Sequence, residues 1–395
     1  MDLSGLKFFA PLQRYFDHLH EQKAHPNRNL HLDEYLCLML LAYFNPAITG
    51  LRQLVKLPEY PVVDRNLGLQ HTSLGSFSEA SSVFDPEPLR RIFLELSGDA
   101  CAANAPARPK CLSANLRVLA ADATLWKLLP RMVPELYQQR SRARKAEFKA
   151  HVVFNVFDHV PAEAELTAGH VDERHVLPLQ LHSGAMYVLD RGYQSCALFR
   201  DILQTENSLV ARIRLHVGYD VLESRALSAA ALAVGVTADL SVQVRNDRNE
   251  KIERPLRLVI AKVVCPPPKN IDPKHKRGKY AAPARTESSY ELVLLTDRFD
   301  LDASEILAIY NYRWQIEIFF RWFKCVLKCR HLFAETPNGI ALQVYSALIA
   351  SLLIVIYTQR KPTKMLLFVL QMRFQGLATW EQVEAEIQKC KPVAK

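Results

Sequence analysis

The sequence has few of the residues that mark disulfide frameworks, zinc sites or nucleotide-binding loops. Its 395 residues include eight cysteines without a Cys-x-x-Cys pair, which indicates reduced core thiols of an intracellular protein. Cys325 and Cys329 lie four residues apart, but no second ligand pair completes a zinc site. A glycine-rich phosphate loop, a Gly-x-Ser-x-Gly motif and a His-Glu-x-x-His motif are all missing. These absences argue against a nucleotide-binding enzyme, a serine hydrolase and a zinc protease.

Targeting and membrane signals are also scarce. The first residues lack a basic region followed by a long apolar stretch, so we expect no signal peptide. The apolar run at 341–357 is 17 residues long and contains Gln343, Ser346 and Ser351, whereas a membrane span needs about 20 residues. We therefore predict a buried core helix there, no membrane association and a cytoplasmic location.

The composition is that of a globular protein with a basic surplus. Hydrophobic residues make up 49% and charged residues 23% of the chain, and the net charge is +9. A chain of this length holds two or more domains. The positive charge weakly favours a polyanionic partner such as nucleic acid.

The pattern along the chain predicts an α/β protein with helical ends. Short capped helices predict a helical N-terminal region, which suits either DNA-end binding or a plain helical bundle. Alternating and apolar runs predict strands at 116–124, 148–158, 163–171, 186–190, 209–214 and 291–296, with a helix at 195–206. The predicted segments are a DNA-binding domain at 1–112, a catalytic domain at 113–214 and 291–335, a β-rich insertion at 215–290 and a helical region at 336–395.

One predicted helix carries four polar side chains on a narrow stripe. A capping box at Asp302 and Glu305 begins it. At about 100° per residue, three side chains fall within roughly 40° of Glu317; they are Tyr310, Arg313 and Lys324. The rest of the helix is apolar, so a carboxylate aimed inward needs a cation, a metal or strong hydrogen bonds. An internal ion pair between Arg313 and Glu317 accounts for the helix alone equally well.

Two further acids follow predicted strands. Asp122 and Asp190 each end an apolar run, and open sheets place their chemistry at strand ends. With Glu317 they would supply the carboxylates that two divalent cations need in phosphoryl transfer. Arg313, Lys324 and Tyr310 would then hold phosphates beside the metals.

These motifs carry a resemblance. Asp-Ala-Thr at 122, Asp-Arg-Gly-Tyr at 190 and Tyr-x2-Arg-x3-Glu-x6-Lys at 310–324 resemble the DDE transposases of bacterial insertion sequences. They resemble more narrowly the group with a Tyr-Arg-Glu-Lys signature and a β-strand insertion before the final Glu. The resemblance covers about residues 116–335, and the separation of 127 positions from Asp190 to Glu317 (317 − 190) leaves room for the insertion.

The resemblance implies an RNase H-like fold and cut-and-paste transposition. It implies two Mg²⁺ ions, with Mn²⁺ as a substitute, bound by Asp122, Asp190 and Glu317. Tyr310, Arg313 and Lys324 match the phosphate-contacting positions. The implied partners are double-stranded DNA, as terminal inverted repeats and target, and a second copy of the chain in the DNA-bound synaptic complex.

One departure concerns base flipping. Some relatives place a Trp in the insertion, whereas the four Trp residues here (126, 314, 322 and 380) all lie outside 215–290. Tyr219, Tyr280 or Tyr290 would be the substitutes. The departure bears on hairpin formation at the transposon end and not on nicking or strand transfer.

The remaining basic and aromatic residues have two interpretations each. The basic stretches 131–149 and 269–279 would contact DNA or form solvated loops. His151 would face the metals or, as we prefer, serve as a satisfied sheet residue. Arg191 and Tyr193 directly follow the second acid, which favours DNA contacts over a purely structural turn. Two other functions stay open: a catalytically silent DNA-binding protein derived from a transposase, and another RNase H-like nuclease such as a resolvase.

Overall fold

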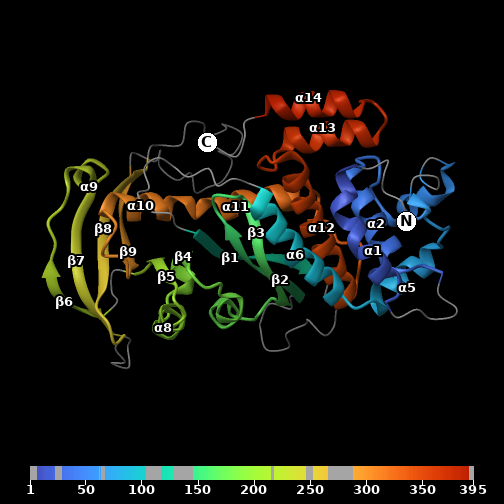
Figure 1. The fold of residues 1–395 in the computed structure, drawn as a ribbon. Coiled ribbons are helices and arrows are strands. Elements are labelled where there is room, and N and C mark those ends of the chain that lie inside the picture. Colours follow the sequence, from blue (N-terminus) through green and yellow to red (C-terminus); the bar gives the residue numbers. More distant parts are fainter. Residues whose placement is uncertain are drawn as a thin grey trace, which may run out of the picture. The chain divides into compact units, whose positions relative to one another are not determined.

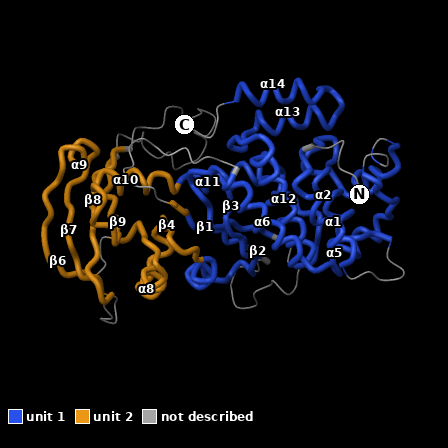
Figure 2. The backbone as a smooth tube through the Cα atoms, viewed as in Figure 1, with its two compact units in different colours: residues 1–109, 120–180, 314–395 blue, residues 110–119, 181–313 orange. Residues whose placement is uncertain are grey.

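The computed structural model describes residues 7–22, 29–61, 63, 67–103, 117–128, 146–214, 218–245, 252–265 and 288–390. They fall into two compact units, coloured separately in Figure 2. Unit 1 comprises residues 1–109, 120–180 and 314–395, and unit 2 comprises residues 110–119 and 181–313. The boundaries of these units differ from the four segments expected from composition, and that four-part division stays a prediction.

Unit 1 is mainly helical. Its N-terminal elements are η1 (Lys7–Leu12), α1 (Gln13–His20), α2 (Leu32–Phe44), α3 (Leu51–Leu54), η2 (Leu57–Glu59), α5 (Leu74–Val83) and α6 (Glu87–Ala103). Helix α2 ends before Asn45, which is followed by Pro46, a residue that cannot continue a helix. A serine at position 76 also suggests an N-cap from sequence, but α5 begins one turn earlier: Ser73 is its N-cap and accepts a hydrogen bond from the Ser76 backbone N–H at 3.0 Å.

The apolar run 341–357 is a core helix of unit 1, as predicted. It lies within α12 (Pro337–Thr358), whose apolar window is 94% buried although its length and composition would allow a membrane span. Figure 1 shows α12 beside α2 and α6, and it also contacts α5 and β3 (Val160–Ala168). The Tyr43 hydroxyl of α2 donates to the Gln343 carbonyl at 2.9 Å. The chain continues with α13 (Lys364–Phe374) and α14 (Trp380–Lys389).

Three strands complete unit 1, in the order β3-β2-β1. Strands β2 (Ala146–Asn155) and β3 pair antiparallel, as the alternating sequence predicts. Two short helical turns, α7 (Glu173–Val176) and η4 (Leu177–Gln180), follow β3. Strand β1 (Arg117–Leu128) is longer than expected, so Asp122 lies inside the strand rather than at its end. Beyond Asp122 the residues become partly exposed, and Leu125, Trp126 and Lys127 alternate exposed, buried and exposed, as residues of a strand do.

Unit 2 contains the first residues of β1 and six further strands. They follow in the order β4 (Ala185–Leu189), β5 (Ser208–Arg212), β9 (Ser288–Thr296), β8 (Leu256–Cys265), β7 (Val236–Val244) and β6 (Tyr219–Ser224). Strands β4 and β5 are parallel and joined through α8 (Cys196–Gln204), whose cap is Ser195; a parallel pair needs such a crossover. The pairs β5–β9, β9–β8, β8–β7 and β7–β6 are antiparallel.

The predicted insertion therefore extends a sheet. Strands β6, β7 and β8 and the short helix α9 (Ala229–Ala233) all lie within 215–290, and β8 pairs along nine residues with β9. Strand β6 is not apparent from the sequence, because an exposed edge strand lacks a buried face to reveal it; Val221 and Leu222 are each 54% exposed. The α/β fold class with a β-rich insertion and helical ends is confirmed.

The long helix predicted after Asp302 is divided. Helix α10 (Ala303–Tyr312) begins at the expected capping box, with the Asp302 backbone N–H donating to Glu305 at 2.9 Å. Helix α11 (Trp314–Arg321) follows, and η7 (Trp322–Val326) is a π-helical turn. Because a π turn is wider than an α turn, the spacing of 100° per residue does not hold as far as Lys324. The single stripe of four polar side chains is therefore wrong in this detail.

Candidate functional site

In unit 2, Asp190 lies directly after β4, as predicted. It is half-buried and is the N-cap of the short turn η5 (Arg191–Tyr193). The Tyr310 hydroxyl of α10 donates a long hydrogen bond, 3.4 Å, to Asp190 Oδ1. Burial raises the pKa of Tyr310, while the nearby Arg313 opposes that rise. The hydroxyl therefore stays protonated at neutral pH and can donate to the carboxylate.

Arg313 completes this group in unit 2. It lies at the C-terminal end of α10, is 9% exposed, and its guanidinium carbon is 5.9 Å from the centre of the Tyr310 ring. This distance is at the outer limit of a cation–π contact. Arg191 is exposed beside Asp190, whereas Tyr193 is only 5% exposed. The burial of Tyr193 favours a structural role for that ring over a direct DNA contact.

In unit 1, Asp122 and Glu317 are both half-buried. The Asp122 carboxylate accepts a hydrogen bond from the Ala123 backbone N–H at 2.8 Å. Glu317 lies on α11, whose apolar side packs through Phe319: the Phe319 ring centre is 5.0 Å from that of Phe154 on β2 and 5.5 Å from that of Phe323. Aromatic packing thus sets the position of the helix that carries Glu317.

Lys324 is held against the strand that carries Asp122. Its Nζ donates to the Leu125 carbonyl at 2.5 Å and lies 4.3 Å from the centre of the Trp126 ring. The Trp126 indole N–H in turn donates to the Cys329 carbonyl at 2.8 Å. Burial lowers the pKa of Lys324 to about 8. The contact between Trp126 and Lys324 has no signal in the sequence. The position of Trp126 between two exposed residues indicates only that Trp126 is buried.

The donor set suits a divalent cation in kind. All three acids are carboxylates with partial exposure, the ligand type that Mg²⁺ prefers. In the described part of the chain, no group of three or more His, Cys, Asp and Glu side chains is placed to hold a metal ion. Asp122 and Glu317 belong to unit 1 and Asp190 to unit 2, so neither unit alone holds the whole predicted ligand set.

Other predicted residues divide between structural roles and undescribed segments. His151 is 2% exposed and its Nε2 lies 2.8 Å from the Thr167 hydroxyl oxygen, which places it in the sheet, but its Nδ1 is buried with no hydrogen-bond partner among the described residues, so the prediction of a fully satisfied histidine is not confirmed; burial lowers its pKa to about 4. Lys149 is buried in a 2.8 Å ion pair with Glu173, so it is neither a solvated residue nor a DNA contact. Tyr290 is 42% exposed beneath Arg212.

Several predictions fall on residues that the structure does not describe. These are residues 131–145 of the basic stretch 131–149, the basic stretch 269–279, and Tyr280. The DNA-contact and loop interpretations of these segments stay predictions. Tyr219, the remaining substitute for a base-flipping Trp, is half-exposed at the start of β6.

Comparisons with known proteins point to one family. The family model described as "Transposase DDE domain" matches residues 113–353. A Sinorhizobium fredii protein named as transposase y4zB is 27% identical over 213 residues, 53% of this chain and 53% of that protein. A Geobacillus stearothermophilus protein named as a transposase of insertion sequence element IS5377 is 35% identical over 70 residues, 18% of this chain and 19% of that protein.

The chain thus spans about half or less of the length of the curated relatives it matches. Among solved structures, the piggyBac transposase synaptic complex with hairpin DNA aligns with a TM-score of 0.42 and 13% identity, covering 98% of this chain and 83% of that one.

Proposed function

The chain belongs to the transposase DDE-domain family, and on that premise we propose that it cleaves DNA at transposon ends and joins the ends to target DNA. The observation that carries the proposal is the family match over 113–353, which includes every predicted site residue. Its family associates the chain with chemistry that depends on a divalent metal. Cut-and-paste transposition is the specific route that we propose.

We propose Asp122, Asp190 and Glu317 as the acids that bind the metal, with two Mg²⁺ ions as the natural complement and Mn²⁺ as a substitute. Such ions activate the attacking oxygen and stabilise the leaving oxygen of a phosphodiester. Three observations support this assignment: the donors are carboxylates, all three are partly exposed, and Asp190 follows a sheet strand directly.

The neighbouring side chains would hold the DNA backbone. The Tyr310 hydroxyl, 3.4 Å from Asp190, orients that carboxylate in unit 2. Arg313 offers a guanidinium fork for phosphate oxygens, and Lys324 offers a point charge. Arg191 is exposed next to Asp190 and is proposed as a further backbone contact. The same role for Tyr193 stays a prediction that its burial does not favour.

The partners that we propose are double-stranded DNA and a second copy of the chain. The net charge of +9 supports binding to a polyanion. Cut-and-paste chemistry must process two transposon ends, while each chain has one set of acids, so we propose a dimer in the DNA-bound complex. Light scattering should show a monomer for the protein alone and a dimer when the protein is bound to two end-containing duplexes. A monomer bound to cleaved ends would contradict the proposed dimer.

A cleavage assay on the inverted repeats that flank the element tests the enzyme. Asp122→Ala, Asp190→Ala and Glu317→Ala should each abolish Mg²⁺-dependent nicking, because each removes a metal ligand. Gel-shift affinity should stay near the wild-type value, since binding rests on many basic contacts. The matched control is Asp201→Ala, which removes an exposed acid on α8.

The outcomes separate the open functions. Nicking retained in one variant would remove that residue from the metal site. Binding without any nicking by the wild-type chain would indicate a silent DNA-binding protein. Nicking without strand transfer would indicate another nuclease such as a resolvase.

A further inference from the structure

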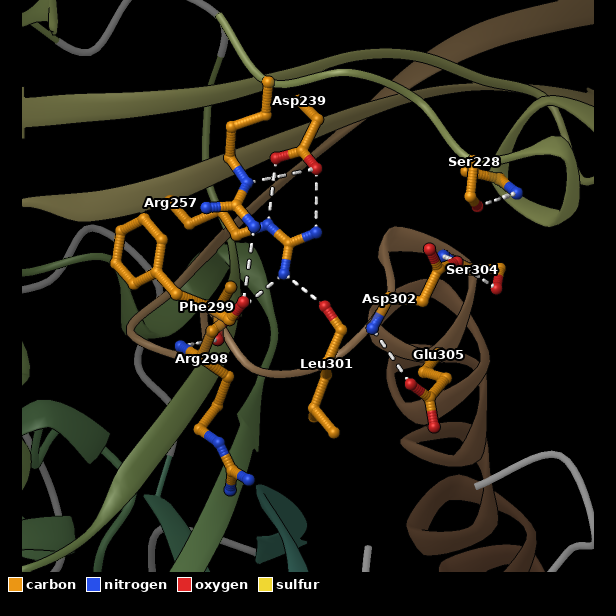
Figure 3. A network of polar contacts seen from close by, with 12 residues as sticks. Ser228, Asp239, Arg257, Arg298, Phe299, Leu301, Asp302, Ser304 and Glu305 are labelled. Atoms are coloured by element: carbon orange, nitrogen blue, oxygen red, sulfur yellow. Dashed lines mark hydrogen bonds and ion pairs between the residues drawn. The ribbon is translucent and has the colours of Figure 1, made fainter. Parts of the chain in front are cut away.

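A buried arginine lies at the centre of a polar network in unit 2 (Figure 3). Arg257 on β8 is 2% exposed and Asp239 on the adjacent strand β7 is 4% exposed. The guanidinium donates to both carboxylate oxygens, with Nε at 2.9 Å and Nη2 at 2.8 Å. This two-pronged geometry is the strongest form of the arginine–carboxylate pair, and it fixes the direction of the remaining nitrogen.

The remaining nitrogen reaches the loop before α10. Arg257 Nη1 donates to the carbonyl oxygens of Arg298 at 2.9 Å and Leu301 at 2.5 Å. This loop joins β9 to the N-cap residue Asp302. A buried carbonyl without a donor costs free energy, so the arginine both satisfies the loop and determines its path.

Two other residues of the predicted insertion contact the same region. Arg225 Nη2 donates to the Phe299 carbonyl at 3.3 Å, and the guanidinium lies 5.3 Å from the centre of the Phe299 ring. Although burial acts to raise it, hydrogen bonds from Ser304 and Ser228 leave the pKa of Asp302 below its ordinary value. Ser228 is the cap of α9. The insertion thus contacts this loop and helix start from three positions.

Helix α10 leads from this network to the candidate site. The capping box at Asp302 and Glu305 begins the helix, and Tyr310, two turns later, reaches Asp190. A loop that moved by a fraction of an ångström would carry the Tyr310 hydroxyl out of range of Asp190, because their hydrogen bond is already long at 3.4 Å.

We propose that Arg257, oriented by Asp239, is a positioning residue that fixes the start of α10 and thereby places Tyr310 against Asp190. The β-rich insertion then braces the catalytic helix, independently of any contact that it makes with DNA. The activity part of this inference rests on the proposed transposase function, whereas the bracing of α10 does not.

The test replaces both members of the pair, so that neither is left buried without the other; Arg225, which also lies 3.7 Å from Asp239, is one-third exposed and can be solvated. Arg257→Met alone would strand the Asp239 carboxylate and risk unfolding, whereas replacing both members of a buried pair by apolar residues often preserves stability. We therefore choose Arg257→Met with Asp239→Val. The matched control is Arg245→Met with Asp220→Val, which removes the half-exposed 2.6 Å pair between β7 and β6 in the same insertion.

Two readouts decide the proposal. In the free protein, backbone amides of residues 303–306 should exchange hydrogen at least tenfold faster in the Arg257/Asp239 variant, which should still melt in one cooperative transition although the carbonyls of Arg298 and Leu301 lose their donor. On end-containing DNA, single-turnover cleavage should slow by up to about tenfold, the effect of losing the Tyr310 hydroxyl, with unchanged DNA affinity. Arg257→Lys keeps the positive charge on a single donor nitrogen, so its exchange and cleavage rates should lie between those of the wild type and the Arg257/Asp239 variant. The control pair should change neither rate.

Unchanged exchange at 303–306 in the folded variant would overturn the brace. Faster exchange with wild-type cleavage would overturn its role in positioning Tyr310. If the wild-type chain does not cut DNA at all, the failure belongs to the proposed function, and the exchange measurement alone decides whether Arg257 braces α10.

Discussion

The two helices that carry the Tyr-Arg-Glu-Lys residues are held in different ways. Helix α10, with Tyr310, begins at a network of buried directional hydrogen bonds centred on Arg257. Helix α11, with Glu317, packs through aromatic rings, Phe319 against Phe154 and Phe323. Hydrogen bonds define a position sharply but fail when one partner is lost. Ring packing loses stability gradually, because the cost of a substitution grows with the volume that it removes.

This difference predicts different failures for the two helices. Damage to the α10 network should mainly disturb the geometry around Asp190, since a buried ion pair adds little net stability. Damage to the α11 packing should mainly lower the stability of unit 1, because buried aromatic area contributes strongly to folding.

The largest effect should come from the aromatic side. Phe319 is 6% exposed, and Phe319→Ala should lower the free energy of unfolding by about 3–5 kcal/mol, through lost burial and a residual cavity. Urea denaturation measures the change. Phe319→Leu is the control, and it should cost clearly less because it removes less volume. A cost below about 1 kcal/mol for the alanine variant would break the contrast between the two helices.

The next effect should come from one hydroxyl on the polar side. Tyr310→Phe removes the donor to Asp190 and should slow DNA cleavage about tenfold, since a hydrogen bond to a charged group is worth about 1.5 kcal/mol. Single-turnover nicking measures the rate, and a thermal melt should show a stability close to wild type. Tyr290→Phe, at an exposed ring, is the control. Equal rates for both variants would show that the Tyr310 hydroxyl does not orient Asp190.

Much of the local structure could be predicted because it depends on neighbours in the sequence. The capping box at Asp302, the core helix at 341–357 and the strand before Asp190 all appear where the pattern places them. Hydrophobic periodicity and capping are short-range signals, and they suffice for such elements.

The errors involve interactions between distant residues. The end of β1 was placed too early because Trp126 is buried by η7 and not by neighbours in sequence. The π turn at Trp322–Val326 has no local signature that distinguishes it from a continuous helix. Arg257 and Asp239 are 18 residues apart in the sequence, and the loop that Arg257 contacts lies more than 40 residues after Arg257. Neither composition nor spacing reveals such contacts.

The salt dependence of binding compares one cation from each helix region. Arg313→Ala and Lys324→Ala should each reduce the slope of log K against log salt by about 1, if each side chain contacts one phosphate. This corresponds to about a fourfold smaller loss of affinity between 50 and 200 mM salt. Anisotropy titrations on end-containing DNA measure the slope. A destabilised Arg313→Ala variant with an unchanged slope would support a structural ion pair with Glu317 instead.

The smallest effect should be a pH dependence of DNA binding that comes from Lys324. Burial between Trp126 and Leu125 lowers the pKa of Lys324 to about 8, so its charge falls from about nine-tenths at pH 7 to half at pH 8. Affinity for DNA should therefore drop about twofold over that interval. The free energy of unfolding changes in the opposite direction. Between about pH 8 and the ordinary lysine pKa of 10.5, the folded chain binds fewer protons than the unfolded chain, so the free energy of unfolding rises with pH. Lys324→Arg, which stays charged throughout, should bind DNA equally well at pH 7 and 8. The same twofold drop in that variant would assign the titration to another group and leave Lys324 without a phosphate contact.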